Sequence, residues 1–529
     1  MKSQKIYKTI FIIFVMMHVL LVAFLGQQKN GYHYDEKLTF ALANNKNSMK
    51  GLDIVNGQQY TGDSLFEKYA AVEEGNSFNY KMVWKNQAND VHPPLYYAII
   101  HTICSFFPGK YTRWFGLIPN IVCLILIDCL LYIGICGTYK DELLAILVTM
   151  ISGLSLLFLN MTLFFRMYSL MTVWVVAISM LYMNYSDHKF DKRFYCLCYI
   201  IIVAGTMTQY YFLIYLFFLS LYFGSSMLFQ KKWKESLKFC LTVGVAGISC
   251  IIIFPSMLHQ IFGHEKRGGE AFEAIQTGNN FVQYIKEYID ILNTNLLSSK
   301  IVYFLIACVV LVIIVIVMKG RKAECRCLQN SPRMILFAVI CYTLLIAKIA
   351  PYRIDRYVFP IGWGYIFFAI CFFKVHLDCL INKKHIMKTL VILIMFSALL
   401  IISYQDANWR FVYRFQPSGE LSTMITDYSE LPVLYIYKIK SRIICNAEEL
   451  KEYSSYTFAK PKDLENILES IQERKMVIYI STDFDSDKRE KVMNILSEKG
   501  ITQDKMIHLY DSWYASAYLI QTNNVGEIK

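Results

Sequence analysis

The segment Thr9-Ile-Phe-Ile-Ile-Phe-Val-Met-Met-His-Val-Leu-Leu-Val-Ala-Phe-Leu25 is an apolar run that follows Lys2, Lys5 and Lys8. As a helix it is long enough to approach the ~30 Å hydrocarbon core of a bilayer, and its basic end predicts a cytoplasmic N-terminus. A cleaved signal peptide is the alternative. The run is long for one, however, and Gly26-Gln-Gln-Lys offers no small-x-small cleavage motif. We therefore expect a retained first span.

The composition extends this expectation to most of the 529 residues. Apolar residues make up 55% of the chain and charged residues 18%, whereas soluble domains carry about a quarter charged residues. This excludes a disordered, a collagen-like and a disulfide-stapled chain. The net charge of +12 arises mainly from short basic clusters between apolar runs. This is the positive-inside pattern of membrane proteins and gives no reason to expect a nucleic-acid partner.

Ten further apolar runs predict a polytopic α-helical membrane protein of about eleven spans, embedded in the lipid bilayer. Basic clusters around Lys189, Lys231, Arg321 and Lys383 should be cytoplasmic, which places the N-terminus inside and the C-terminus outside. The ten runs lie near residues 114–135, 143–161, 168–185, 194–210, 211–229, 238–256, 300–318, 334–350, 357–374 and 387–404.

With this orientation, residues 26–113 form a first outer loop, and the apolar stretch Leu95–Phe107 inside it cannot cross the membrane. A helix of that length is only ~20 Å long. Pro93 and Pro94 precede it, and proline is favoured in the first helical turn. We expect a juxtamembrane helix that lies in the outer interface.

The membrane domain should comprise residues 1–404, and residues 405–529 should form a small α/β domain on the outer face. We find no glycine-rich phosphate loop and no Cys/His spacing for zinc, so we expect no cofactor and no metal. Strand-like runs at Val433–Lys438, Met476–Ser481, Met506–Tyr510 and Ala515–Ile520 alternate with helical patterns at Asp463–Glu473 and Lys488–Lys499.

The acidic pair Asp35-Glu36 stands about ten residues beyond the first span. A carboxylate held at the outer membrane surface beside aromatic residues could deprotonate an acceptor hydroxyl as a general base. The alternative is a pair of solvated acids in the first turn of an amphipathic helix, where the helix dipole favours them. The dipeptide alone favours this second interpretation.

The segment Asn89-Asp-Val-His92-Pro-Pro is more informative. Pro93 biases His92 toward an extended backbone, so the following helix aims its N-terminus toward Asp90 and His92. Helix N-termini favour anionic groups. An ordinary proline-initiated surface helix is the alternative, and we favour a substrate-binding role.

Four arginines lie at the expected outer ends of spans: Arg113, Arg166, Arg353 and Arg356. A single one of them would be explained as a snorkelling anchor for lipid headgroups. Several on one side of the membrane indicate an anion site, because the guanidinium fork matches two phosphate oxygens. The adjacent Tyr210 and Tyr211 fit either an aromatic belt, which is commoner, or a sugar platform.

These motifs, in this order, resemble those of the glycosyltransferase C superfamily, in particular bacterial relatives of the protein O-mannosyltransferases and lipid A aminoarabinose transferases. The resemblance covers roughly residues 1–404. It rests on Asp35-Glu36, His92-Pro-Pro-Leu-Tyr-Tyr, Arg113 with Ile118-Pro119, Arg166-Met-Tyr168, Tyr210-Tyr211, and Arg356-Tyr357 with Pro360.

The resemblance implies an inverting enzyme of the plasma membrane that uses a polyprenyl-phosphate-linked sugar on the outer face. The acceptor would be a cell-envelope glycan, lipid or protein. Asp35 would be the base, with Glu36 assisting it. The phosphate would be held by Arg113, Arg166, Arg353 and Arg356, and the substrates would contact Asp90, His92, Tyr168, Tyr210, Tyr211 and Tyr357. Phe165 departs from the pattern, because relatives often carry an acidic residue there.

Two other functions compete with this one. A transporter or flippase for lipid-linked saccharides should carry ionisable residues deep in its spans, or broken helices at the midplane. The candidate charges here lie at span ends on one side, which favours an enzyme. A polysaccharide polymerase would share the lipid-phosphate substrate but lack an acidic pair after the first span.

Overall fold

The computed structural model describes two compact units of the chain. The helical unit comprises Met1–Gln28, Gln87–Tyr96 and Gly116–Val412, and the sheet unit comprises Lys29–Asn86, Tyr97–Phe115 and Tyr413–Lys529. Most of the first loop thus belongs with the C-terminal segment and not with the rest of the membrane domain expected at 1–404. The described residues are 2–521 without 30, 47, 49–51, 53, 63, 187–189, 264–266, 278–279, 320–329, 381–384, 406–423 and 472–474.

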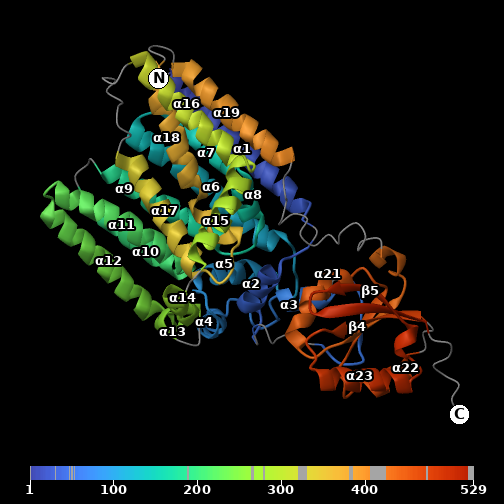
Figure 1. Cartoon of the computed structure of the whole chain (residues 1–529). Helices are drawn as coiled ribbons and strands as arrows, with labels where there is room; N and C mark the ends of the chain where they lie inside the picture. The colour runs from blue at the N-terminus through green and yellow to red at the C-terminus, as the bar shows by residue number, and fades with distance from the viewer. Residues whose placement is uncertain are drawn as a thin grey trace. The chain divides into compact units, whose positions relative to one another are not determined.

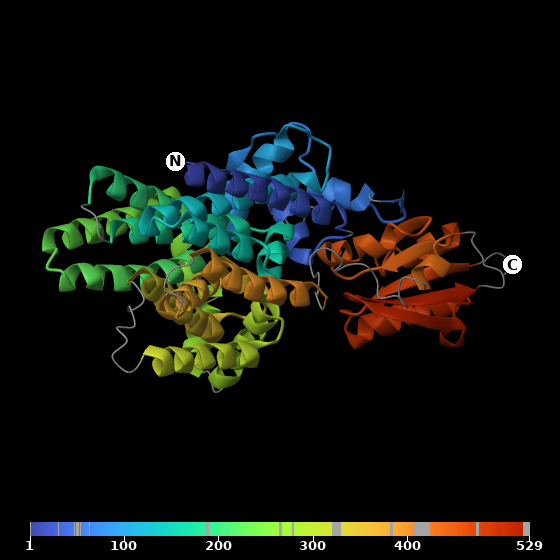
Figure 2. The same ribbon diagram turned by 90° about the horizontal axis from the view of Figure 1, so that it is seen from above.

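The helical unit is a bundle of long apolar helices, among which the green helices α10, α11 and α12 lie side by side in both views (Figures 1 and 2). The helices that make up the bundle are α1 (Lys2–Gln27), α6 (Trp114–Tyr139), α7 (Glu142–Gly153), α8 (Leu156–Leu163), α9 (Tyr168–Tyr185), α10 (Lys192–Thr208), α11 (Tyr211–Phe229), α12 (Trp233–Ile253), α15 (Phe281–Leu297), α16 (Ile301–Lys319), α17 (Asn330–Ile349), α18 (Gly362–Leu380) and α19 (His385–Gln405). Short elements join them: α13 (Ser256–Phe262), α14 (Arg267–Thr277), η2 (Asp355–Tyr357) and η3 (Phe359–Ile361).

Among the described residues, eight helices are long and apolar enough to cross a membrane, or nine if α7 and α8 count as one span. The chain is thus a multi-pass membrane protein, with fewer clear spans than the eleven expected. The expected span at 194–210 is α10, of only 17 residues. The apolar part of α19, Leu390–Gln405, is also short. The basic residues Lys189, Arg321, Lys322, Arg326, Lys383 and Lys384 lie outside the described residues, so the orientation stays a prediction.

The expected span at 143–161 is broken, because α7 and α8 meet at an angle of 60°. Ser155 caps the new helix, its Oγ accepting a hydrogen bond from the Phe158 amide at 3.4 Å. Gly153 is the last residue of α7, and a Cβ there would lie 2.5 Å from the ring of His18 on α1. Only glycine fits this close helix contact without a shift of the ring.

The sheet unit contains a six-stranded sheet of order β1-β3-β2-β4-β6-β5. β2 (Pro432–Ile436) runs parallel to β3 (Ser455–Ala459) and to β4 (Lys475–Ser481). β5 (Met506–Ser512) and β6 (Ala515–Gln521) form an antiparallel hairpin whose second strand pairs with β4. The helices α22 (Leu464–Ser470) and α23 (Ser486–Glu498) cover an apolar core that includes Leu434, Ile478 and Leu496.

All four expected strands of the tail are present, but β3 was not predicted, and β1 (Gln59–Tyr60) comes from the first loop. Side-chain hydrogen bonds within the sheet unit also join the first loop to the tail. Tyr456 donates to the carbonyl of Gly62 at 2.8 Å, and Lys37 donates to the carbonyl of Ile444 at 2.7 Å. The tail therefore forms one sheet together with the first loop.

The first loop also carries four short helices, α2 (Tyr34–Asn44), α3 (Ser64–Ala70), α4 (Tyr80–Asn89) and α5 (Leu95–Ser105). α5 begins directly after Pro94, as expected, and its 11 residues are too few to cross a bilayer. Its place in the outer interface remains a prediction.

Candidate functional site

Asp90, His92 and Arg166 form a connected group in the helical unit, which we call the arginine–histidine centre. His92 Nδ1 lies 2.8 Å from Asp90 Oδ2, and His92 Nε2 lies 3.4 Å from Arg166 Nη2. The imidazole ring therefore connects the Asp90 carboxylate to the Arg166 guanidinium.

The Asp90 carboxylate is ionised in this centre. Burial alone would raise its pKa, but the hydrogen bond and charge of His92 and the charge of Arg166 outweigh burial and lower the pKa below its ordinary value. The sequence analysis placed Asp90 and His92 with the substrate and Arg166 with the donor phosphate. The structure brings these three residues together.

Arg166 is buried, with 4% of its surface exposed, and the end of α8 fixes its position. Asn120, on α6 directly after Pro119, donates from Nδ2 to the carbonyls of Thr162 and Phe164, both at 2.9 Å. Tyr96 donates in turn to Asn120 Oδ1 at 3.1 Å. The sequence analysis missed Asn120, although a lone amide within an apolar run is a signal that could have drawn attention to it.

Gln260, on the short helix α13, is a second residue that the sequence analysis missed. It is buried, and its Nε2 donates to the backbone carbonyls of Gln87 at 2.7 Å and Asp90 at 2.9 Å. The hydroxyl of Tyr210 donates to Gln260 Oε1 at 2.5 Å. Tyr210 is thus linked through Gln260 to the backbone of Asp90, and its contact with a sugar remains a prediction.

The other candidate tyrosines of the helical unit are packed in ring contacts. The ring centroids of Tyr211 and Tyr357 lie 5.3 Å apart in an edge-on arrangement. The carbonyl of Tyr357 accepts a hydrogen bond from Tyr342 at 2.8 Å. Tyr168 is buried and meets the ring of Phe359 edge-on at 6.2 Å. Their substrate contacts remain a prediction.

Arg353 and Arg356 lie on the turn before α18 and are held mainly by tyrosine rings. The Arg353 guanidinium lies 3.5 Å above the ring centroid of Tyr284, a close cation–π contact. The Arg356 guanidinium lies 5.5 Å from the ring of Tyr357. Asp355 Oδ1 accepts a hydrogen bond from the Arg356 amide at 2.9 Å. That these arginines hold a phosphate remains a prediction.

The sheet unit holds the second group, Lys29, His33, Asp35 and Glu36, which we call the acidic centre. Glu36 is fully buried, and its carboxylate forms an ion pair with the Lys29 ammonium at 3.0 Å. The same carboxylate accepts a hydrogen bond from the His33 backbone amide at 2.6 Å. His33 closes a capping box at the start of α2, where its side chain accepts from the Asp35 amide at 3.0 Å. Both acids thus lie in a first helical turn, as the simpler alternative held, but Glu36 is not solvated.

Asp35 lies in a different environment from Glu36. Its side chain is 19% exposed, and Oδ2 lies 3.6 Å from His33 Nδ1. That nitrogen already accepts from the Asp35 backbone amide, so it does not carry a proton toward the carboxylate. Of the two adjacent acids, Asp35 is therefore the one whose side chain is partly exposed.

Arg113 belongs to the same unit. Its Nη1 donates to the backbone carbonyl of Lys29 at 2.7 Å, and the Lys29 ammonium pairs with Glu36. Arg113 therefore supports the acidic centre, and its role toward a donor phosphate remains a prediction.

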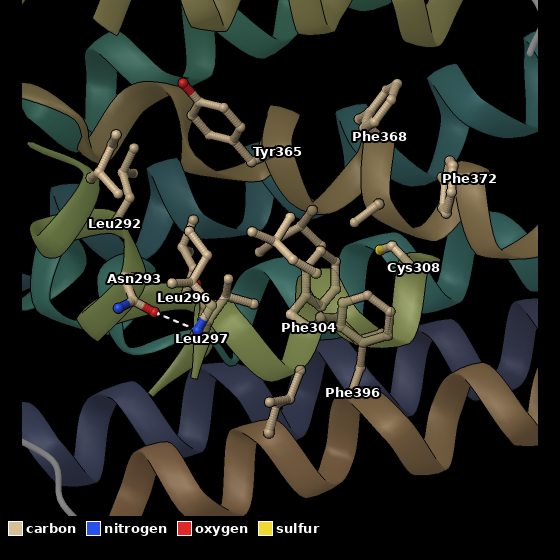
Figure 3. Close-up of a pocket in the computed structure, with 18 of the residues that line it drawn as sticks. Leu292, Asn293, Leu296, Leu297, Phe304, Cys308, Tyr365, Phe368, Phe372 and Phe396 are labelled. Carbon is tan, nitrogen blue, oxygen red and sulfur yellow. Dashed lines mark hydrogen bonds between the residues drawn. The ribbon is translucent and has the colours of Figure 1, made fainter. Parts of the chain in front are cut away.

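The helical unit also contains a partly open apolar cavity of about 560 Å³ among α7, α15, α16, α17, α18 and α19. Figure 3 shows Phe304, Phe368, Phe372 and Phe396 around it, with Leu292 and Leu296 from α15. Almost all of its lining is hydrocarbon. The sequence analysis did not predict it, because a cavity depends on how helices distant in sequence pack.

Within the described part of the chain, no group of three or more His, Cys, Asp or Glu side chains could hold a metal ion. Phe165, which stands where relatives often have an acid, is fully buried. A Cβ on Gly116 would lie 2.5 Å from its ring. This position therefore packs α6 and supplies no carboxylate.

No protein-family model and no curated protein sequence matches the chain. Among solved structures, ArnT from Cupriavidus metallidurans bound to undecaprenyl phosphate is 8% identical, with a TM-score of 0.47, over 98% of this chain and 99% of that one. The apo form of the same protein is also 8% identical, with a TM-score of 0.48, over 97% of this chain and 98% of that one. The archaeal oligosaccharyltransferase AglB from Archaeoglobus fulgidus, in complex with an inhibitory peptide and a dolichol-phosphate, is 10% identical. Its TM-score is 0.39, over 97% of this chain and 75% of that one.

Both neighbours belong to the glycosyltransferase C superfamily that the sequence motifs resemble. Likenesses this distant do not establish an activity, so the residues must carry the functional argument.

Proposed function

We propose that this protein is a membrane glycosyltransferase of the hexosyltransferase type. It would transfer a sugar from a polyprenyl-phosphate donor to a cell-envelope glycan, lipid or protein on the outer face of the plasma membrane. The observation that carries the proposal is the division of Asp35-Glu36 into one accessible carboxylate and one buried, ion-paired carboxylate. Adjacent acids in different environments are typical of sites in which one acid reacts and the other supports it.

The donor phosphate fits the arginine–histidine centre. His92 contacts Arg166 through one ring nitrogen and the anionic Asp90 through the other, so the imidazole ring separates the guanidinium from that carboxylate. A guanidinium held in this way can stabilise the charge that grows on a departing phosphate. Arg353 and Arg356, in the same unit, would contribute further positive charge. The apolar cavity is large enough for part of a polyprenyl chain.

In the proposed reaction the acceptor hydroxyl attacks the anomeric carbon on the side opposite the phosphate. Its proton passes to the Asp35 carboxylate, a bond forms between the acceptor oxygen and the anomeric carbon, and the carbon–oxygen bond to the phosphate breaks. The products are the glycosylated acceptor, with inverted configuration, and polyprenyl phosphate. Glu36 keeps the first turn of α2 in place through Lys29 and His33, and so positions Asp35.

One observation favours the second candidate, a flippase for lipid-linked saccharides. His18 on α1 and Asp128 on α6 are buried with an Nδ1–Oδ2 distance of 2.9 Å, and His18 Nε2 lies 3.0 Å from the Gly153 carbonyl at the break between α7 and α8. Buried ionisable groups and a broken span are features of transporters. The contact also has a structural explanation, because it ties α1 to the broken span.

The two candidates are separated by chemical analysis of a reconstituted system. Purified protein in lipid nanodiscs is mixed with a synthetic polyprenyl-phosphate sugar and an acceptor extract of the native envelope. A glycosyltransferase releases polyprenyl phosphate and adds one hexose mass to the acceptor, with inversion visible by NMR of the anomeric centre. A flippase leaves the donor intact and moves it between the leaflets of vesicles.

A further inference from the structure

The hairpin of β5 and β6 has an unusual tip within the sheet unit. Ser512 pairs with Ala515, so the turn consists only of Trp513 and Tyr514. Two-residue hairpin turns favour glycine and asparagine, since their backbones need positive φ. Tyr514 nevertheless has a φ of +62°, which is rare for an aromatic residue. Such a conformation persists only where its surroundings enforce it, and it marks candidate functional sites.

The surroundings of Tyr514 do enforce this conformation. Its carbonyl accepts hydrogen bonds from the Thr482 amide at 2.9 Å and from Ser481 Oγ at 3.3 Å. The Arg442 guanidinium lies 4.4 Å from the centroid of its ring and is itself bound to Asp483 at 2.6 Å. The tip is thus a rigid aromatic surface, with the Arg442 guanidinium over the ring of Tyr514 and the Asp483 carboxylate bound to that guanidinium.

This aromatic surface is accessible and adjoins the acidic centre. Trp513 is 47% exposed and Tyr514 is 39% exposed. The Trp513 indole meets the imidazole of His33 edge-on, with ring centroids 6.4 Å apart. His33 is the residue that caps α2 and accepts from the Asp35 amide. The hairpin tip therefore lies beside the carboxylate proposed as the base.

We propose that Trp513 and Tyr514 form a saccharide platform that holds the acceptor glycan next to Asp35. This inference rests on the proposed function and specifies its acceptor as a carbohydrate. The C–H face of a pyranose packs on an aromatic ring such as the exposed Trp513 indole, while its hydroxyls need polar partners nearby. Here Arg442 and Asp483 provide a donor and an acceptor.

A bilayer anchor is the other role that exposed Trp and Tyr commonly have. Carboxylates close to the tip oppose it. Asp511 stands two residues before Trp513 and its side chain is 71% exposed, and Asp483 is paired with the Arg442 guanidinium that lies over Tyr514. Anionic lipid headgroups repel such a surface, whereas carboxylates are common hydrogen-bond acceptors for sugar hydroxyls.

The kinetic test uses the full chain in nanodiscs, the synthetic donor and a graded amount of envelope glycan. Trp513→Ala should raise the KM for the acceptor about tenfold, equivalent to about 1.4 kcal/mol, while the KM for the donor stays unchanged. Trp513→Phe should recover part of the loss. Ile507→Ala is the matched control, because Ile507 is 59% exposed on β5 of the same hairpin. An unchanged acceptor KM in Trp513→Ala, or an equal rise in Ile507→Ala, overturns the platform.

A binding test keeps this proposal separate from the proposed function. The fluorescence of Trp513, taken as the difference between wild type and Trp513→Phe, is recorded with trisaccharides of glucose, mannose and N-acetylglucosamine. It is also recorded in vesicles of brominated phosphatidylcholine. A saccharide-dependent shift supports the platform even if no transfer is detected. Quenching by the brominated lipid identifies a bilayer anchor and overturns it, and so does the absence of a shift with every trisaccharide.

Discussion

The Lys29 ammonium lies 3.0 Å from the Glu36 carboxylate, and both groups are almost completely shielded from water. Burial makes this pair a structural element, because a charge that is used to hold another buried charge is not available to a substrate. The neighbouring Asp35 is partly exposed. The dipeptide therefore combines a supporting acid with an accessible acid, and the two should respond differently to substitution.

Loss of one partner of this pair should destabilise the sheet unit. Glu36→Gln leaves the Lys29 charge buried without its counterion, which typically costs about 3–5 kcal/mol. The double variant Lys29→Met/Glu36→Leu removes both charges and should recover most of that loss. Thermal unfolding of the purified variants checks this. Equal stability of Glu36→Gln and wild type would show that the pair does not support the fold.

Asn120 should control donor binding without touching the donor. Asn120→Ala removes both hydrogen bonds that fix the carbonyls of Thr162 and Phe164, so Arg166 loses its support. We expect the KM for the donor to rise roughly tenfold, since misplacing one charge-assisted contact costs about 1.5–3 kcal/mol. Asn184→Ala is the control, because Asn184 also donates to α6, at the Gly134 carbonyl, 3.2 Å away. A similar rise in the control would mean a general packing effect.

The His18–Asp128 pair distinguishes the enzyme from the flippase. Asp128→Asn breaks a buried pair and should lower stability. Replacement of both residues, His18→Leu/Asp128→Leu, should be far milder. For an enzyme the double variant keeps sugar transfer at close to the wild-type rate. If it folds normally but is inactive, the pair is functional and the flippase interpretation gains.

The stability of the sheet unit should fall as the pH rises above the acidic range. Burial raises the pKa of Glu449, despite hydrogen bonds from Ser512, Tyr479 and Asn446. Because the folded protein binds this proton more tightly than the unfolded chain, protonation of Glu449 stabilises the fold. The stabilisation is complete below the pKa of Glu449 in the unfolded chain, about 4.3, and is lost as the pH rises through its pKa in the folded protein. Glu449→Gln should flatten the dependence and raise the unfolding temperature at pH 8. Glu490→Gln, at an exposed position, should leave the dependence unchanged.

The parts of the fold that depend on local sequence could be predicted. The proline pair places the start of α5, and alternating apolar residues mark four of the strands in the tail. The pairing of β1 with β3 could not be predicted, because Gln59 and Thr457 are nearly four hundred positions apart. The 60° break between α7 and α8 was also missed, since both halves read as one apolar run.

The candidate site follows the same division. Residue type and position singled out Asp35, His92 and Arg166, and the resemblance of the ordered motifs to a known superfamily suggested their roles. Asn120, Gln260 and His18 were not recognised. Each is a single polar residue whose partners lie far away in the sequence. Their roles depend on which helices pack together, which periodicity does not specify.

The turnover of Asp35→Asn tests the central proposal most directly. The amide keeps the shape and the capping turn but cannot accept a proton from the acceptor hydroxyl. General-base assistance is typically worth 10²–10⁴-fold, so kcat for sugar transfer in nanodiscs should fall by about that factor while the donor KM stays nearly constant. Wild-type turnover by Asp35→Asn would contradict the assignment of Asp35 as the base, and full activity of both Asp35→Asn and Glu36→Gln would contradict an enzymatic role for this acidic pair.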